Sequence, residues 1–307
     1  MASQKEVKNR IASVKNINKI TRAMEMVAAA RLRRAEQRIS DMRPYAEGMR
    51  KLTRRAAAQA GGVPRVPVLE ERVNVKRVGI VLVTGDRGLA GAFNNNIIRE
   101  GMRMAGKARQ EGAEPSFAVV GRKGVSALTF RKQDVSASYV GFTDRPAFAN
   151  AREIGEEMTA RYVDQDLDRV ELVYNRFVSP LTQHVWRQTL LPLQQAEVMG
   201  EGAEEEAAAH EEETEAEKAQ SRSEWFYEPD PEELLGRLIP EYVTISVYRA
   251  LLESAASELG ARMTAMRNAA ENAESMIGDL TLEMNRARQA EITQEILEVV
   301  GGAEALG

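Results

Sequence analysis

The residue types that most often carry chemistry in proteins are scarce in this sequence. The chain of 307 residues contains no cysteine and only two histidines, His184 and His210. The lack of cysteine excludes disulfides, thiolate metal sites and cysteine nucleophiles. His184 lies in an expected strand, where a packed core histidine is the default, and His210 lies in a glutamate-rich tract. The sequence therefore predicts no catalytic residue, no metal site and no cofactor.

One glycine-rich turn, Gly85–Gly91, is placed where a phosphate-binding loop would lie. It follows the buried-strand run Val78–Val83 and precedes a helical pattern. Its spacing, G-x-x-G-x-x-G, matches neither the dinucleotide fingerprint nor the P-loop, and no Lys-Ser/Thr pair follows it. We expect a tight turn shaped by an ion pair between Asp86 and Arg87. A nucleotide-binding α/β enzyme remains an alternative.

The formal net charge of -4 is the sum of two strongly charged segments. Residues 1–55 carry 15 Lys or Arg against 5 Asp or Glu, and Glu197–Lys218 carries 10 Glu. A basic helix is one footprint of nucleic-acid binding. It lacks interleaved aromatic residues, which favours a solvated face or a fit to an acidic protein partner. A nucleic-acid-binding coiled-coil protein is the second alternative.

These charges belong to a long helix that we predict over residues 1–60. Its apolar residues recur in steps of three and four, which places them on one helical face. They are Val7, Ile11, Val14, Ile17, Ile20, Met24 and Val27. Proline lacks a backbone donor, so Pro44 is the expected place for a bend.

Residues 241–307 predict a second long helix, beginning after Pro240. Its apolar residues keep a heptad spacing, which is typical of a coiled coil. They are Leu252, Ala255, Leu259, Met266, Ala270, Ala273, Ile277, Leu280, Met284 and Ala287. Since each helix has a single apolar seam, we expect the two to form an antiparallel coiled coil. A helix of this length spans roughly 80 to 90 Å.

Between the helices, residues 75–194 alternate strand and helix patterns. This alternation predicts a three-layer, Rossmann-like α/β domain with a largely parallel sheet. We divide the rest into an acidic low-complexity insertion at 195–224 and an aromatic segment at 225–240. No apolar run approaches the roughly 20 residues of a spanning helix, and the start is unlike a secretory signal.

Several motifs, in order along nearly the whole chain, are similar to those of one known family. They are Ile11–Asn16, Lys19–Ala30, Thr84–Asn94, Tyr248–Ser254, Ala261–Met266, Asn285–Ala290 and the terminal pattern Ile292–Ala305. Together they resemble the gamma subunit, the central stalk, of the bacterial F-type ATP synthase.

The resemblance implies a non-catalytic rotor shaft. Such a shaft couples proton translocation through the membrane sector to ATP synthesis or hydrolysis in a hexamer of alpha and beta subunits. The implied partners are the alpha and beta subunits, the epsilon subunit and the c-ring, with no nucleic acid. The implied location is the cytoplasmic side of the bacterial cell membrane, peripheral and reached only through the complex.

The resemblance also assigns contact residues on the shaft. Met24 falls on the family position near an acidic loop of the beta subunit. Arg288 and Gln289 fall on the pair that hydrogen-bonds the catch loop of beta. Thr293 and Glu295 belong to the terminal signature and are expected to contact neighbouring subunits.

Further contacts are implied at the two ends of the molecule. Trp225 and Tyr227 match the foot that meets epsilon and the ring. Met284 stands where the family often has an aromatic residue, which affects a contact one turn before Arg288. The end of the second helix would form an apolar bearing, made by Ile296, Val299, Val300, Ala303 and Leu306.

Overall fold

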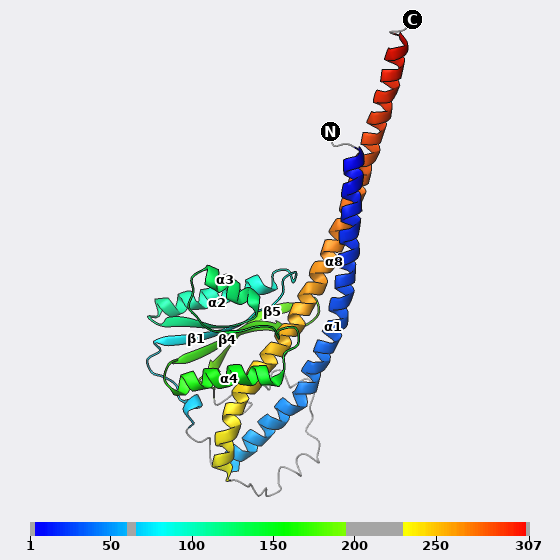
Figure 1. Ribbon diagram of the computed structural model, residues 1–307. Coiled ribbons are helices and arrows are strands. Elements are labelled where there is room, and N and C mark those ends of the chain that lie inside the picture. The colour runs from blue at the N-terminus through cyan, green and yellow to red at the C-terminus, as the bar shows by residue number, and fades with distance from the viewer. Residues whose placement is uncertain (1–3, 60–65, 195–229, 305–307) are drawn as a thin grey trace.

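Two long helices form an antiparallel coiled coil, and an α/β domain packs against its side in the computed structural model (Figure 1). The structure describes residues 4–59, 66–194 and 230–304. The helices are α1 (Gln4–Gln59) and α8 (Pro231–Glu304), of 56 and 74 residues. The predicted fold class is confirmed. The acidic tract Glu197–Lys218, Trp225 and Tyr227 lie outside the described residues.

The domain is built on one five-stranded sheet with the order β3-β2-β1-β4-β5. Four strands are parallel, and only the edge strand β5 runs antiparallel to its neighbour β4. The strands are β1 (Arg77–Val83), β2 (Glu114–Val120), β3 (Val135–Tyr139), β4 (Arg169–Phe177) and β5 (Gln183–Leu191). The largely parallel sheet expected from the alternating pattern is therefore present.

Helices cover both faces of this sheet, giving three layers (Figure 1). One face carries α2 (Phe93–Gln110) and α3 (Arg122–Phe130), and the other carries α4 (Phe148–Val163). The N-terminal third of α8 completes the second face, and a short 3-10 helix, η1 (Pro67–Leu69), packs beside it. The same helix thus belongs to the coiled coil and to the domain.

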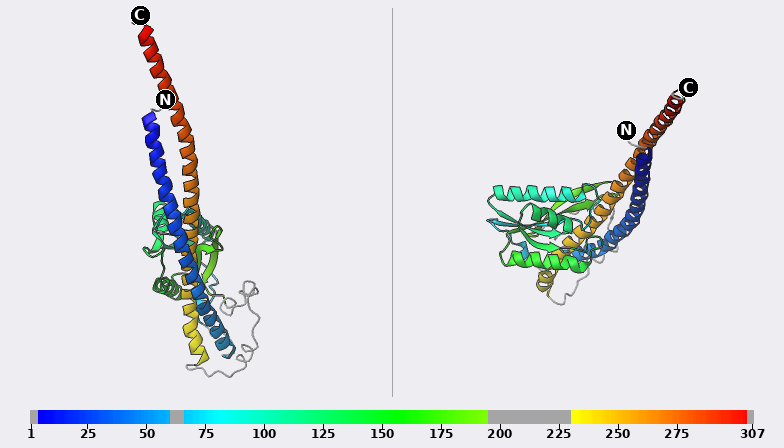
Figure 2. Two further views of the ribbon diagram at one scale, coloured as in Figure 1. Left: turned by 90° about the vertical axis from the view of Figure 1, so that its right-hand side faces the viewer. Right: turned by 45° about the horizontal axis from the view of Figure 1, so that its top comes forward.

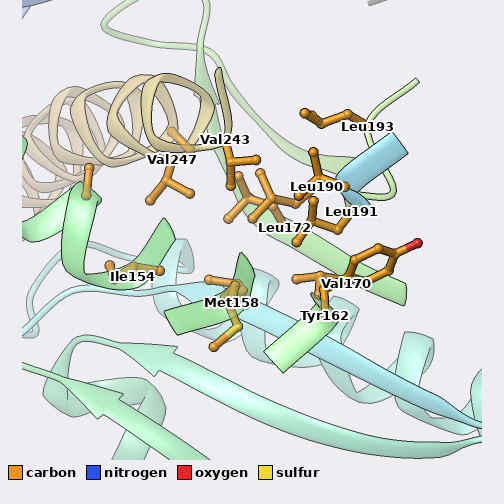
Figure 3. Packing of buried hydrophobic residues seen from close by; sticks show 14 of the residues in the cluster. Ile154, Met158, Tyr162, Val170, Leu172, Leu190, Leu191, Leu193, Val243 and Val247 are labelled. Atoms are coloured by element: carbon orange, nitrogen blue, oxygen red, sulfur yellow. The ribbon is translucent and has the colours of Figure 1, made fainter. Parts of the chain in front are cut away.

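The second face shows how α8 is anchored (Figure 3). Val243 and Val247 of α8 lie with Ile154 and Met158 of α4 over Leu172 of the sheet. All five side chains are fully buried. Burial of each such side chain contributes about 1.5 to 3 kcal/mol relative to exposure. The anchor is apolar and extensive, so domain and shaft form one rigid body.

α8 begins earlier than the sequence suggested. We expected a start after Pro240, but the helix begins at Pro231 and continues through Pro240. Proline is favoured in the first helical turn, where its missing N–H has no helical partner. The added turns place Leu235 and Ile239 in the core, both fully buried.

α1 presents a different face to α8 than predicted over part of its length. Three of the expected seam residues are more than half exposed, namely Ile17, Ile20 and Val27. The buried positions instead keep a heptad spacing, in steps of four, three or seven, along Val7, Ile11, Val14, Thr21, Ala28, Leu32 and Ala35. Two successive steps of three carry a residue off a heptad seam. α1 continues unbroken through Pro44. The helix curves along its length (Figure 2).

The seam predicted on α8 is confirmed. Most of its residues are buried. Ile277 and Met284 are partly buried, and they pack against the cluster that contains Ala273 and Leu280. The apolar residues of α8 keep the heptad spacing over a longer stretch than those of α1. The sequence of α8 therefore identifies the buried face of that helix with less ambiguity.

Candidate interaction surfaces of the coiled coil

The coiled-coil seam consists of two apolar clusters with a polar layer between them. The cluster near the N-terminus of α1 contains Val7, Ile11, Val14, Ala273 and Leu280. The cluster beside the α/β domain contains Leu32, Ala35, Ala256 and Leu259. Alanines on both helices allow a close approach of the two backbones.

The polar layer joins the helices through directed contacts. Asn18 Nδ2 donates to the carbonyl oxygen of Ala270 at 2.7 Å. Arg22 pairs with Glu274 at 2.8 Å, and Glu25 pairs with Arg267 at 2.9 Å. A groove of about 610 Å³ lies at this level, lined by both ion-paired arginines, by Glu25 and by Met26, Ala29, Met263, Ala270 and Glu271.

Beyond α1, the end of α8 is a single helix (Figure 1). Val7 of α1 clusters with Leu280 and Met284, so no other helix of the described residues lies beside α8 from about Arg288 onward. Five apolar side chains of this end are 47% to 72% exposed, namely Ile292, Ile296, Leu297, Val299 and Val300. A contiguous exposed apolar surface of this kind marks a protein contact.

The residues assigned to subunit contacts fall in two separate places. Arg288, Gln289, Thr293 and Glu295 are exposed on the single-helix end of α8, where Thr293 Oγ1 donates to the Gln289 carbonyl at 2.8 Å. Met24 is half-buried in the coiled coil, level with the polar layer. The structure therefore does not bring Met24 and Arg288 together, and they lie about 35 Å apart along the shaft.

A charged junction between the shaft and the α/β domain was not found from the sequence. Glu258 of α8 is buried against the turn after β1, and it pairs with Arg262 one turn along. A Cβ atom added to Gly85 would lie 2.8 Å from the Glu258 carboxyl carbon. Asp144 extends the junction to the other shaft helix, because its carboxylate contacts Arg31 of α1 at 3.5 Å.

The two carboxyl groups nearest this junction are shifted in opposite directions. Burial raises the pKa of Glu258 to about 7, and nearby Asp144 and Asp86 add to the shift against the opposing charge of Arg262. Burial alone would also raise the pKa of Asp86. Hydrogen bonds from the backbone of Gly141, Thr143 and Arg122 outweigh that effect and hold the Asp86 pKa below its ordinary value. Asp86 is therefore a charged structural anchor of the turn.

The first two backbone donors of the glycine-rich turn are already paired with side chains elsewhere in the domain. The N–H of Gly85 donates to Asn94 at 2.8 Å, and the N–H of Asp86 donates to Thr143 at 2.9 Å. The expected pair of Asp86 with Arg87 is wrong: Arg87 contacts Asp144 at 3.6 Å instead. Donors that are already satisfied are not available to a phosphate, which argues against the nucleotide-binding alternative.

His184 is also placed differently from the expectation. It is exposed on β5, opposite Arg176 of β4, and is not a core residue. β5 is an edge strand whose alternate side chains point away from the domain, which its local pattern did not reveal.

Two of the basic residues of α1 are paired with acidic groups. Arg22 and Arg31 each contact an acidic group of another element, Glu274 and Asp144. This pairing removes part of the support for nucleic-acid binding. In the described part of the chain, no helix is long and apolar enough to span a bilayer.

Comparisons with known proteins agree with this architecture. A family model described as "ATP synthase" matches residues 3–306. An "ATP synthase gamma chain" of Rubrobacter xylanophilus is 44% identical over 100% of this chain and 99% of the relative. A protein of the same description from Desulfitobacterium hafniense is 41% identical over 100% of both chains.

Solved structures give the same result at the level of fold. A central-stalk chain of the Tetrahymena thermophila mitochondrial ATP synthase matches with a TM-score of 0.58 and 28% identity, covering 81% of this chain and 99% of its own. A chain of the Euglena gracilis mitochondrial ATP synthase matches with a TM-score of 0.64 and 18% identity, covering 99% and 94%. The second match concerns the fold alone.

Proposed function

The chain belongs to the ATP synthase gamma-chain family and is a central-stalk subunit, and we propose that it works as a non-catalytic rotor shaft. In this role it couples proton translocation through a membrane sector to ATP synthesis or hydrolysis in a hexamer of alpha and beta subunits. Nucleotide chemistry then takes place on the neighbours of this chain.

The observation that carries the proposal is the single-helix end of α8. Five exposed apolar side chains lie there in a region that α1 does not reach. Apolar surface of this extent is stabilised when it is covered by a partner. A ring of subunits around the helix would cover it on all sides and would still allow it to turn.

Below this end, the shaft is asymmetric. From the level of Val7, α1 lies beside α8, so the single helix becomes a pair. The α/β domain lies on only one side of this pair (Figure 2). As an asymmetric shaft turns, it presents different contacts to each surrounding subunit in succession. Different contacts are what a shift between conformations of different nucleotide affinity requires.

Specific contacts follow from the positions of the assigned residues. We propose that Arg288, Gln289, Thr293 and Glu295 contact beta subunits at the level of the bearing. Met24, which lies about 35 Å lower, contacts an acidic loop of beta. Exposure of the first four residues on the single helix supports the assignment.

At the other end, we propose contacts with the epsilon subunit and the c-ring. Trp225 and Tyr227 are the assigned contact residues, and they precede the start of α8 at Pro231. The chain would thus reach the cytoplasmic side of the bacterial membrane through the complex. The division of the chain into segments 1–60, 75–194, 195–224, 225–240 and 241–307 is part of the same proposal, with the one change that segment 225–240 includes the first turns of α8.

The chain's lack of cysteine allows a direct test of these contacts. Met24→Cys and Tyr227→Cys would each carry a short thiol-reactive photo-crosslinker in the assembled, membrane-bound complex. We expect the first variant to cross-link to beta and the second to epsilon or the c subunit. A matched control, Phe130→Cys, places the probe on an 88% exposed side chain of the α/β domain.

Membranes washed at low ionic strength provide the second arm of this test. The tagged chain should be released together with alpha and beta subunits. Release of the chain alone, or cross-linking of the Met24 variant only to unrelated proteins, would contradict the proposed role.

A further inference from the structure

We propose that the polar layer of the coiled coil is a register lock, which fixes the axial position of α1 against α8. The lock consists of Asn18 and two ion pairs, Arg22–Glu274 and Glu25–Arg267. This inference deepens the proposed rotor function and rests on it for its consequence in the complex. The register concerns only the contacts between α1 and α8, so it can be tested without the complex.

Asn18 occupies a seam position between apolar residues. It lies four residues after Val14 on the buried track of α1, and its side chain crosses the interface to the Ala270 carbonyl at 2.7 Å. The acceptor is a backbone carbonyl, a group that every residue of α8 carries, so this bond joins the helices at this level without itself choosing the register. The choice of register rests on the two ion pairs beside it.

The apolar clusters on either side specify the register only weakly. Three of their nine buried residues are alanines, namely Ala35, Ala256 and Ala273, and an alanine accepts several neighbours with little change in packing. Sliding by one heptad, about 10 Å, would again place apolar residues opposite one another. The polar layer therefore carries the information that the alanine-rich seam lacks.

The two ion pairs discriminate against slippage in both directions. The helices are antiparallel, with Arg22 opposite Glu274 and Glu25 opposite Arg267. A slip of one heptad in one direction places Arg22 opposite Arg267. A slip in the other direction places Glu25 opposite Glu274. Each slip breaks both attractive pairs and creates one repulsive pair, which is unfavourable whichever way the helix moves.

A fixed register matters for a shaft that transmits torque. α8 is anchored in the α/β domain through Val243 and Val247, whereas the N-terminal half of α1 is held mainly by the coiled coil. Axial slippage of α1 would absorb twist that the shaft should pass on. The polar layer lies between the anchor and the single-helix end, where it can oppose this slippage.

Disulfide trapping reads the register directly, because the chain has no cysteine of its own. Val14→Cys with Ala273→Cys reports the native register, in which both positions share one buried cluster. Val14→Cys with Met266→Cys or with Leu280→Cys reports the two slipped registers. In the otherwise unchanged full-length chain, we expect rapid oxidation of the native pair only.

The decisive variant exchanges the charges on α1, as Arg22→Glu with Glu25→Arg. In the native register both pairs become repulsive, whereas each slipped register gains one attractive pair. We expect the native disulfide to form about tenfold more slowly, and the slipped disulfides to appear. Adding Arg267→Glu and Glu274→Arg restores both pairs with reversed polarity, and native cross-linking should return to within about twofold of the original rate.

A readout in the assembled complex separates this inference from the proposed function. The charge exchange, without cysteines, should lower the ratio of ATP-driven proton pumping to ATP hydrolysis, and the fourfold variant should restore it. If the unchanged chain supports no pumping, the proposed function fails, whatever the cross-links show.

The register lock is overturned if the charge exchange leaves the native cross-linking unchanged. It is also overturned if the fourfold variant does not recover native cross-linking, because pairing is then not what fixes the register. If the twofold variant does not fold, recovery of folding and of native cross-linking in the fourfold variant supports the lock.

Discussion

Glu258 and Arg262 form an ion pair one helical turn apart in α8, with only 3% and 10% of their side chains exposed. The pair lies where the shaft crosses the turn after β1, and Gly85 leaves the space that the Glu258 carboxyl group occupies. The attraction within a buried ion pair offsets the cost of desolvating both charges only when the geometry is good. Removing either partner leaves the other as an uncompensated buried charge.

The first prediction concerns pH. Burial raises the pKa of Glu258 from 4.5 to about 7, so the folded chain binds a proton more tightly there than the unfolded chain does. Stability should therefore fall as pH rises from about 4.5 to about 7, by on the order of 2 kcal/mol. Glu258→Gln should remove most of this slope in thermal unfolding, and it should lower stability above about pH 7, where Arg262 loses its charged partner. Part of the slope should remain, because burial also raises the pKa of Glu171.

Glu283→Gln is the matched control, since Glu283 is exposed on the same helix. It should leave the pH dependence as it is. An unchanged slope in Glu258→Gln would show that Glu258 is charged in the folded chain throughout this range.

The second prediction concerns the close approach at Gly85. An added Cβ would lie 2.8 Å from the Glu258 carboxyl, so Gly85→Ala should destabilise the chain by about 1 to 3 kcal/mol. Gly88→Ala is the control in the same turn, because its nearest neighbour would be the flexible end of Lys123 at 3.5 Å. Chemical denaturation of both variants tests the difference, and equal stabilities would mean that the junction is loosely packed.

The third prediction tests which face of α1 meets α8. Ile11 is 7% exposed and Ile17 is 53% exposed, on the same helix. Ile11→Ala should lower the free energy of unfolding by about 2 to 4 kcal/mol, whereas Ile17→Ala should change it by less than about 0.5 kcal/mol. A loss of similar size in both variants would restore the seam suggested by the sequence, which included both residues.

The fourth prediction concerns the single-helix end. Arg288→Ala with Gln289→Ala should leave the isolated chain folded, since both side chains are exposed beyond α1. In the complex, the double variant should weaken coupled ATP synthesis. Arg286→Ala, also exposed on α8, is the control. Normal ATP-driven proton pumping in the double variant would exclude a coupling role for the pair.

Local patterns predicted much of this fold, because they report what each segment buries. Continuous apolar strands such as Val78–Val83 and the heptads of α8 have one plausible interpretation each. On α1, two tracks of three and four diverge after Val14, one through Ile17 and one through Thr21. Only the partner helix decides between them, so the choice could not be made from α1 alone.

The junction was missed for a different reason. Glu258 is one carboxylate among many on a charged helix, and no local feature distinguishes it. Its burial depends on Gly85, far away in the chain, and on Asp144 from a third element. For the same reason, the ion pair of Asp86 was assigned to its neighbour Arg87, whereas its cationic partner is Arg122 at 3.9 Å, and Gly141 and Thr143 from a distant loop donate hydrogen bonds to it.

The proposed rotor function can be tested by observing whether this chain rotates inside its complex. The complex would be fixed to a surface through its alpha and beta subunits, with a visible probe on Phe130→Cys, the only cysteine of the chain. On addition of ATP, we expect stepwise rotation of the probe in one direction, three steps to a turn. ATP hydrolysis at a normal rate with a stationary probe would contradict it.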